Sequence, residues 1–169
     1  MQDNNAFFPL FMDLSDKTVA VVGGGRIASR RIRTLLPFCR KIRVIAPELQ
    51  ESLSELFTSS REGCCSLTWE KDFYRKDYLR DAFLVLACTD DPLLNSRICE
   101  EAKKAGAFVN NCSDKSQCDF YFPGIVRKDP VVIGITAGGK DHALAKRVRE
   151  ELEGLSFMPD GNCARDSGE

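Results

Sequence analysis

The sequence predicts an α/β fold with a doubly wound parallel sheet, and three observations support this prediction. Residues 18–23 are β-branched and apolar almost throughout, which is typical of a strand buried on both faces of a parallel sheet. The turn Gly23-Gly24-Gly25 completes this run, and residues 26–36 then show the spacing of an amphipathic helix that ends at Pro37. Short apolar runs and helical stretches continue to alternate as far as residue 111.

The other elements of this region follow from similar patterns. Asp91 is placed to cap a helix that has Pro92 at its first position and ends at Gly106. Further strands are expected at residues 42–46, 67–70, 83–88 and 108–110, and a short helix at 49–58. In a sheet of this kind the ligand crevice lies at the carboxyl ends of the strands.

After residue 111 the pattern changes. Residues 120–126 and 131–136 are two β-rich runs that predict a hairpin, and residues 141–153 predict a helix with apolar residues at i+4 spacing. We therefore divide the chain into an α/β domain at 1–112, a second segment at 113–157, and a polar tail at 158–169 that we expect to be disordered.

The composition excludes several classes of protein. The chain has 24 Lys and Arg against 25 Asp and Glu, so it lacks the basic excess typical of nucleic-acid binding. No apolar run reaches the roughly 20 residues of a membrane helix, and the N-terminus lacks a basic signal-peptide region, which suggests a cytoplasmic protein. The eight cysteines form no C-x-x-C pair, so we expect reduced, mostly buried thiols and no metal site.

The strongest functional signal is the pattern Gly23-x-Gly25-x-x-Ala28. Gly23 permits the tight turn, Gly25 lets backbone N–H groups approach a pyrophosphate, and the small Ala28 lets helix and strand pack closely. Because the pattern follows a buried strand and opens a helix, it predicts a Rossmann-like dinucleotide site rather than a merely structural turn. The predicted cofactor contacts of this turn are Gly23, Gly24, Gly25, Arg26, Ile27 and Ala28.

A dinucleotide site usually has an acidic residue about 20 positions further on, where it binds the adenosine ribose. Ala46 stands at that distance, and Glu48 follows it beyond Pro47. These three residues are candidate cofactor contacts, although Glu48 fits a solvated turn equally well. Arg26 and Arg43 would instead favour a 2′-phosphate, so the sequence only leans towards NAD.

Two more strand ends carry polar residues. Thr89 and Asp90 are candidates to line the cofactor crevice. The run from Asn110 to Asp114 either points into the crevice or forms an ordinary turn, and Asp114 is its best general-base candidate. His142, the single histidine, is either a surface residue or a group that titrates near neutral pH. Basic residues cluster at 26–33 and at 140–149, which indicates either solvated helix faces or a funnel for a polyanion.

Several segments together resemble a known family. Five segments resemble the precorrin-2 dehydrogenase and sirohydrochlorin ferrochelatase family and stand in the same order as in that family. They are Phe8-Pro-Leu-Phe-Met-Asp-Leu, the glycine turn, Ala87-Cys-Thr-Asp-Asp-Pro-Leu-Leu-Asn, Cys118-Asp-Phe-Tyr-Phe-Pro-Gly-Ile-Val and Gly138-Gly-Lys-Asp-His-Ala-Leu-Ala. The resemblance covers roughly residues 7–155. The family includes the N-terminal type of domain found in siroheme synthases.

The resemblance implies NAD-dependent dehydrogenation of precorrin-2 to sirohydrochlorin in siroheme biosynthesis, with insertion of Fe²⁺ in some members. It also implies a homodimer, in which the segment at 113–157 supplies dimer and substrate contacts. Because the tetrapyrrole carries many carboxylates, Asn111, Lys140 and Arg147 are the expected substrate contacts.

Three positions depart from the family pattern. The catalytic aspartate of the family falls at Ser113 here, with Asp114 one residue later, so both are candidate catalytic residues. Ala137 replaces a common serine, and His142 stands where proline is more frequent, which makes this histidine a third catalytic candidate. Two other functions therefore stay open, a non-catalytic NAD-sensing module and a tetrapyrrole chelatase or carrier without dehydrogenase activity.

Overall fold

The computed structural model describes residues 8–59 and 65–156, and these form parts of two compact units. Of the described residues, those within Leu10–Phe122 form one unit, and Phe8, Pro9 and residues 123–156 form the other. The predicted tail at 158–169 lies outside the described residues.

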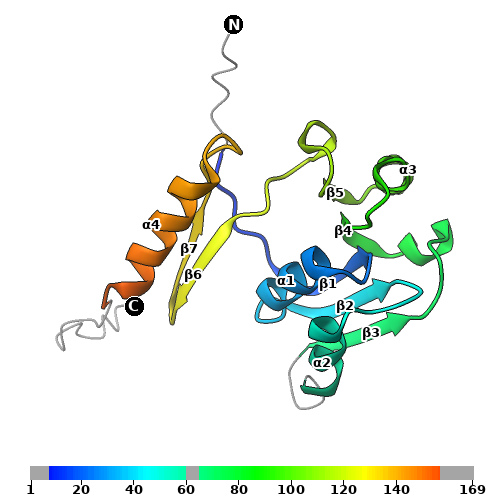
Figure 1. Cartoon of the computed structure of the whole chain (residues 1–169), viewed down its shortest axis with the longest axis horizontal. Coiled ribbons are helices and arrows are strands. Elements are labelled where there is room, and N and C mark those ends of the chain that lie inside the picture. The colour runs from blue at the N-terminus through cyan, green and yellow to red at the C-terminus, as the bar shows by residue number, and fades with distance from the viewer. Residues whose placement is uncertain (1–7, 60–64, 157–169) are drawn as a thin grey trace, which may run out of the picture. The chain divides into compact units, whose positions relative to one another are not determined.

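The larger unit contains a five-stranded sheet in the order β3-β2-β1-β4-β5, in which every pair of neighbours is parallel (Figure 1). The strands are β1 (Leu14–Val22), β2 (Cys39–Ile45), β3 (Ser66–Glu70), β4 (Ala82–Ala87) and β5 (Phe108–Asn111). The order reverses at β1, because β2 lies on one side of it and β4 on the other. This arrangement confirms the predicted doubly wound α/β fold and puts the switch point at the carboxyl ends of β1 and β4.

The helices α1 (Arg26–Leu35), α2 (Glu51–Ser59) and α3 (Pro92–Lys104) cover the two faces of this sheet. Val19 and Val21 belong to a core that includes residues of α1 and α2, whereas Ala20 and Val22 belong to a second core that includes residues of α3. Successive side chains of a strand point to opposite faces, so β1 must be apolar at every one of these positions to be buried on both.

Several local features differ from the expectations. β2 begins at Cys39 rather than at residue 42, and β6 (Gly124–Lys128) begins at Gly124 rather than at residue 120. β1 begins at Leu14 rather than near residue 18, because Leu14 pairs with Cys39 and is buried, while exposed polar residues and a register shift follow it. The short 3₁₀ helices η2 (Lys76–Leu79) and η3 (Lys115–Gln117) were not expected, since their polar sequences carry no helical periodicity.

Residues 113–122, which the sequence groups with the second segment, pack within the first unit. The amide of Asp119 donates to the carbonyl of Val109 at 2.9 Å, and the side-chain amide of Asn110 donates to the carbonyl of Phe120 at 2.8 Å. Phe120 and Phe122 also pack against the core that includes α1.

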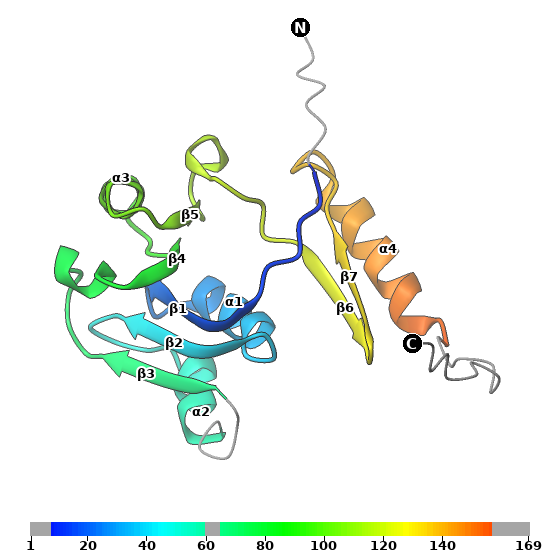
Figure 2. The same cartoon turned by 180° about the vertical axis from the view of Figure 1, so that it is seen from behind.

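The second unit contains β6 (Gly124–Lys128) and β7 (Val131–Ile135), which pair antiparallel, and the helix α4 (His142–Gly154). Figure 2 shows α4 lying alongside this hairpin. The turn before α4 has both Gly138 and Gly139 in the left-handed region, at φ +63° and +70°. Among the described residues of this unit only Val126 is buried in the isolated chain, so its apolar side chains form almost no core of their own.

No helix in the described parts of the chain combines the length and the apolar character needed to cross a membrane.

Candidate dinucleotide-binding site

The glycine turn is held tightly against its neighbouring strand ends. Gly23 has φ +123°, donates its N–H to Ile45 at 2.9 Å, and would bring an added Cβ within 2.4 Å of the carbonyl oxygen of Cys88. A Cβ on Gly24 would lie 2.0 Å from the carbonyl oxygen of Glu48. Neither position can therefore carry a side chain without a backbone shift.

Gly25 differs from these two glycines because a Cβ built on it would meet nothing within 4 Å. Gly25 is also the N-cap of α1 and offers no side-chain hydrogen bond to the first N–H groups of that helix. The N-terminus of a helix with uncapped N–H groups and free space beside it fits a phosphate group. Ala28 is fully buried, as expected for close packing, whereas Arg26 and Ile27 are exposed at the start of the helix.

The end of β2 contributes backbone and a small side chain. The Cβ of Ala46 would lie 3.1 Å from a Cβ on Gly24, and Trp69 donates its indole N–H to the carbonyl of Ala46 at 2.9 Å. Pro47 and Glu48 are exposed, so the Glu48 carboxylate is open to solvent while its backbone borders the glycine turn.

Arg43 does not fit the alternative role as a 2′-phosphate ligand. Its guanidinium pairs with the carboxylate of Asp81 at 2.9 Å and donates to the carbonyl of Tyr78 at 2.9 Å. Asp81 directly precedes β4, at the amino end of the sheet and thus opposite the crevice. The same pairing holds the pKa of Asp81 below its usual value.

The end of β4 is fixed by a buried amide that the sequence reasoning missed. Thr89 donates its N–H and its hydroxyl to the side-chain oxygen of Asn95, at 3.0 and 2.7 Å, and the Asn95 amide donates back to the Thr89 carbonyl at 3.0 Å. Asn95 is completely buried and also donates to the hydroxyl of Ser113 at 2.6 Å. Asp91 caps α3 as predicted, and Asp90 is exposed.

A second buried amide shapes the loop after β5. The side-chain oxygen of Asn111 accepts from the N–H groups of Ser113 and Asp114, at 2.8 and 3.2 Å, while its amide donates to Gln117 at 2.9 Å. Asn111 is thus a structural anchor of the loop, in addition to its predicted role as a substrate contact. Ser113 is exposed, and Asn95 links it to Thr89 on the neighbouring strand end.

The carboxylate of Asp114 caps the short helix η3. It accepts from the N–H and the hydroxyl of Ser116, at 2.9 and 2.7 Å, and these hydrogen bonds lower the pKa of Asp114 below its usual value. The group is therefore ionised at neutral pH, and it is weakened as a base.

Arg31 departs from the expected solvated face of α1. Its guanidinium hydrogen-bonds the side-chain oxygen of Asn110 and stacks over the ring of Phe122, at 4.7 Å from the centroid. Its Nε is buried without a hydrogen-bond partner within the described chain. The helical spacing correctly puts Arg31 on α1, but only the neighbouring strand and loop explain its burial.

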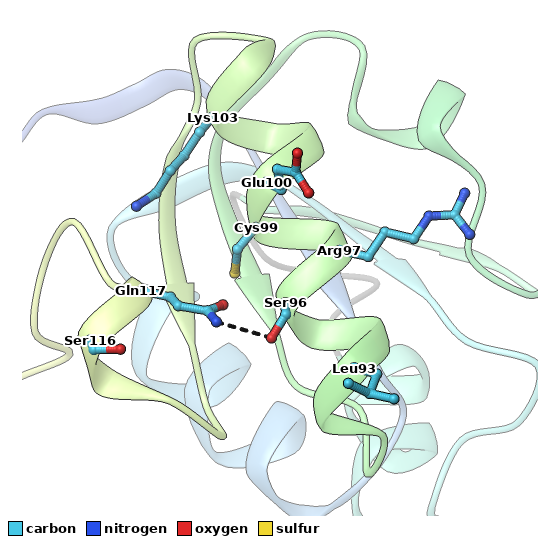
Figure 3. Close-up of a pocket in the computed structure, with 8 residues that line it drawn as sticks. All are labelled: Leu93, Ser96, Arg97, Cys99, Glu100, Lys103, Ser116 and Gln117. Atoms are coloured by element: carbon cyan, nitrogen blue, oxygen red, sulfur yellow. Dashed lines mark hydrogen bonds between the residues drawn. The ribbon is translucent and has the colours of Figure 1, made fainter.

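A hollow of about 590 Å³ lies beside α3 and η3, and its lining includes no residue of the glycine turn. The side-chain amide of Gln117 donates to the hydroxyl of Ser96 at 3.1 Å, and this hydrogen bond, drawn in Figure 3, bridges the loop and the helix there. It is lined by Leu93, Ser96, Arg97, Cys99, Glu100, Lys103, Ser116 and Gln117.

The structure thus places the predicted residues of the strand ends along one edge of the sheet. Glu48 borders Gly24, Gly23 borders Cys88 and Thr89, and Asn95 connects Thr89 to Ser113. Lys140, His142 and Arg147 are all exposed and belong to the second unit, where His142 is the first residue of α4 behind the N-cap Asp141. Among the described residues, no group of three or more His, Cys, Asp or Glu side chains is placed to hold a metal ion.

The fold, the switch point and the glycine turn define the class: this is a Rossmann-type protein with a site for a dinucleotide. A family model described as putative NAD(P)-binding matches residues 10–124. The chain belongs to this family.

Known relatives confirm the resemblance found in the motifs. The siroheme synthases of Photorhabdus laumondii subsp. laumondii and Nitrosospira multiformis are 35% and 37% identical to this chain over 96% of its length. The chain spans only about one third of these relatives, 33% and 34%. The solved structure of SirC, precorrin-2 dehydrogenase, matches with a TM-score of 0.68 and 26% identity, over 86% of this chain and 69% of that one.

Proposed function

We propose that this protein is an NAD-dependent dehydrogenase that oxidises precorrin-2 to sirohydrochlorin. The observation that carries the proposal is the glycine turn, where Gly25 leaves open space at the uncapped start of α1. The relatives named as siroheme synthases and the likeness to SirC, precorrin-2 dehydrogenase, supply the substrate.

The bound dinucleotide would accept the hydride that precorrin-2 loses. The proposed contacts to it are the N–H groups at the start of α1 and the residues of the adjoining strand ends. Those residues are Gly23, Gly24, Gly25, Arg26, Ile27, Ala28, Ala46, Pro47, Glu48, Thr89 and Asp90. NAD is favoured over NADP because Arg43 is paired with Asp81 and the exposed Glu48 carboxylate would repel a 2′-phosphate.

Loss of a hydride from the substrate must be matched by loss of a proton to a base. We assign this step to the Ser113–Asp114 corner, with Asp114 as the base, because its carboxylate is ionised at neutral pH and one oxygen atom is left after capping η3. His142 is the alternative base, because a neutral imidazole nitrogen can accept a proton.

The substrate is a polycarboxylate, so cationic side chains should hold it. We propose Lys140 and Arg147 of the second unit for this role. The amide of Asn111, at the end of β5 in the larger unit, is a separate proposed contact. Asn111 is already bonded to the 113–117 loop, so a contact with substrate would also stabilise that loop.

A homodimer is part of the proposal. The hairpin β6–β7 and α4 leave Val131 at 40%, Leu144 at 41% and Leu155 at 50% exposure, with Val126 as the one buried residue of the described part of this unit. A module with this little core is best explained by burial against a second copy. We further propose that residues 1–112 bind the cofactor and that residues 113–157 supply the dimer and substrate contacts. We also propose a cytoplasmic location.

An anaerobic assay tests it directly. Purified protein receives precorrin-2 and NAD⁺, and the formation of NADH and sirohydrochlorin is followed by absorbance. We expect the two products in equal amounts. NAD⁺ binding without NADH formation would instead favour a nucleotide-sensing module.

Iron insertion needs a separate reaction, in which Fe²⁺ is added to sirohydrochlorin as substrate. Siroheme formation in this reaction, without NADH formation in the first, would favour the chelatase or carrier. Replacing His142 with alanine should slow one of the two reactions if the histidine has a catalytic role.

A further inference from the structure

Two thiols meet at the carboxyl edge of the sheet, beside the proposed cofactor turn. Cys88 follows β4, Cys112 follows β5, and their sulfur atoms lie 2.9 Å apart. Their strands are parallel neighbours, with Ala87 paired to Asn111 and the N–H of Cys112 donating to the carbonyl of Ala87 at 3.0 Å. Adjacent strands of a sheet lie about 4.8 Å apart, which is within the backbone separation that a disulfide spans.

We propose that Cys88 and Cys112 form a redox-active dithiol that hydrogen peroxide oxidises to a disulfide between the ends of β4 and β5. Both cysteines are free thiols in the structure, so the reduced pair is the starting point of the proposed reaction. The inference does not depend on the proposed dehydrogenase activity.

Cys112 is the nucleophile of the pair. It is half-buried, whereas Cys88 is only 6% exposed, so an oxidant from solvent reaches Cys112 first. The hydrogen bond from Cys88 and the positive charges of Arg31 and Arg30 lower the pKa of Cys112 to about 7. The pKa values of the other described cysteines are all raised, with burial as the first cause except at Cys88, where the hydrogen bond to Cys112 comes first.

The half-buried side chain of Arg31, which is bonded to Asn110 two residues before Cys112, adds a second observation to this assignment. Its Nε has no hydrogen-bond partner among the described residues, and such a buried donor favours a negative charge nearby. A thiolate on Cys112 supplies this charge, and Arg31 is held in place by Asn110 and Phe122.

The chemistry balances in two steps. The Cys112 thiolate attacks one oxygen of the peroxide, the O–O bond breaks, and the leaving hydroxide takes up a proton to form water, which leaves a sulfenic acid. Cys88 then loses its proton and attacks the sulfur of Cys112, the S–O bond breaks, and a second water leaves. The peroxide is reduced to two waters, and a small thiol reductant reverses the bond by exchange.

The link would form within the proposed cofactor site. A Cβ at Gly23 would touch the carbonyl of Cys88, and Cys112 directly precedes Ser113. Oxidation would therefore tie together two strand ends that border the crevice.

Peptide mapping of the intact chain tests the proposal. The reduced protein is treated with peroxide, its remaining thiols are alkylated, and it is digested with trypsin. Cleavage after Arg97, Lys103 and Lys104 separates Cys88, Cys99 and Cys112 into different peptides. We expect one major linked pair, which contains Cys88 and Cys112 and disappears on reduction. A dominant link between other cysteines, or no link at all, would overturn the proposal.

Variants then test the order of the steps. In Cys88→Ser, the sulfenic acid at Cys112 should persist and react with dimedone, whereas Cys112→Ser should give no adduct at residue 88. Cys99→Ser is the matched control, and it should form the Cys88–Cys112 link as the natural chain does. A dimedone adduct on Cys88 in place of Cys112 would contradict the assigned nucleophile.

A measurement on the natural chain covers the case in which Cys88→Ser does not fold. The alkylation rate of Cys112, followed by mass against pH, should have its midpoint near the pKa of about 7. Cys99, whose pKa burial raises to about 11, serves as the internal reference. A midpoint for Cys112 at or above that of an ordinary thiol would remove the proposed nucleophile.

Discussion

Gly24 and Gly25 are neighbours in the sequence, but the structure gives them opposite constraints. A side chain on Gly24 would collide with the backbone of Glu48, whereas one on Gly25 would project into open space. One glycine is thus required by the fold, and the other is available to the ligand.

We expect Gly25→Ala to fold and to lose the cofactor. Its backbone has φ −91°, which alanine adopts readily, so the free energy of unfolding should change by less than about 1 kcal/mol. The new methyl group should reduce NAD affinity at least about tenfold by blocking the approach of the pyrophosphate. Calorimetric titration and thermal unfolding measure the two effects.

Gly24→Ala is the matched control, and it should lower the free energy of unfolding by more than about 2 kcal/mol because backbone must move. Unchanged NAD binding in a well-folded Gly25→Ala protein would refute the assigned turn.

Asp114 supports a prediction on pH. The hydrogen bonds from Ser116 lower the pKa of Asp114 below its usual value. The carboxylate therefore stays ionised at every pH above that usual value. If Asp114 is the base, kcat/KM for NADH formation should show no acid limb from this group between pH of about 5 and 8. An acid limb within this range would point to a base other than Asp114.

Substitution tests the same residue. Asp114→Asn should reduce turnover at least about tenfold with unchanged NAD affinity, since it removes the base and leaves the glycine turn intact. Asp77→Asn, at an exposed position on η2 at the opposite end of β4, is the control and should retain more activity. Equal rates for Asp114→Asn and the natural chain would move the search to Asp90, Asp119 or His142.

At the scale of single elements, the first turns of α3 carry Asn95, whose side chain connects two strand ends to the helix that covers them. Asn95 forms hydrogen bonds with Thr89 at the end of β4 and with Ser113 in the loop after β5. The helix is therefore both a cover for the sheet and a clamp between two strand ends.

Asn95→Ala should be strongly destabilising. It removes the hydrogen bonds of the fully buried Asn95 to the N–H and carbonyl of the half-buried Thr89 and to Ser113, which costs about 2–4 kcal/mol of unfolding free energy. Asp91→Ala, which removes only the cap of the same helix, should cost about 1 kcal/mol. Chemical denaturation measures both, and equal losses would argue against the clamp.

The elements show which information the sequence contains. Strand β1 was predictable because burial on both faces requires an apolar residue at every position of its second half. The start of α3 was predictable from the local signals of Asp91 and Pro92. Asn95, Arg31 and the Cys88–Cys112 pair were not predictable, because their partners are contributed by other strands and loops after the sheet has formed.

At the scale of the whole molecule, the two units differ in how much core they possess. Nearly all buried apolar residues lie within Leu10–Phe122, and the second unit has Val126 alone among its described residues. The sequence correctly separates an α/β part from a hairpin and a helix, but it cannot show where Phe120 and Phe122 pack.

The proposed dimer gives a prediction at this scale. Leu144→Glu introduces a charge on the exposed apolar face of α4, so the protein should become monomeric at concentrations where the natural chain is dimeric. Lys146→Glu, a charge change at an exposed position two residues away, should leave the dimer intact. Light scattering gives the mass of each, and a monomeric natural chain would remove the dimer from the proposal.

The cofactor edge is assembled from segments far apart in the chain, namely the turn after β1 and the ends of β2, β4 and β5. During synthesis the glycine turn emerges early, but its neighbour Cys88 and the anchors Asn95 and Ser113 follow much later. A ribosome-bound nascent chain that stops before β4 should therefore fail to retain NAD, even though its glycine turn is complete. The chain would then bind NAD only after the loop that follows β5 has been synthesised, so that cofactor binding is a late step in the folding of the nascent chain.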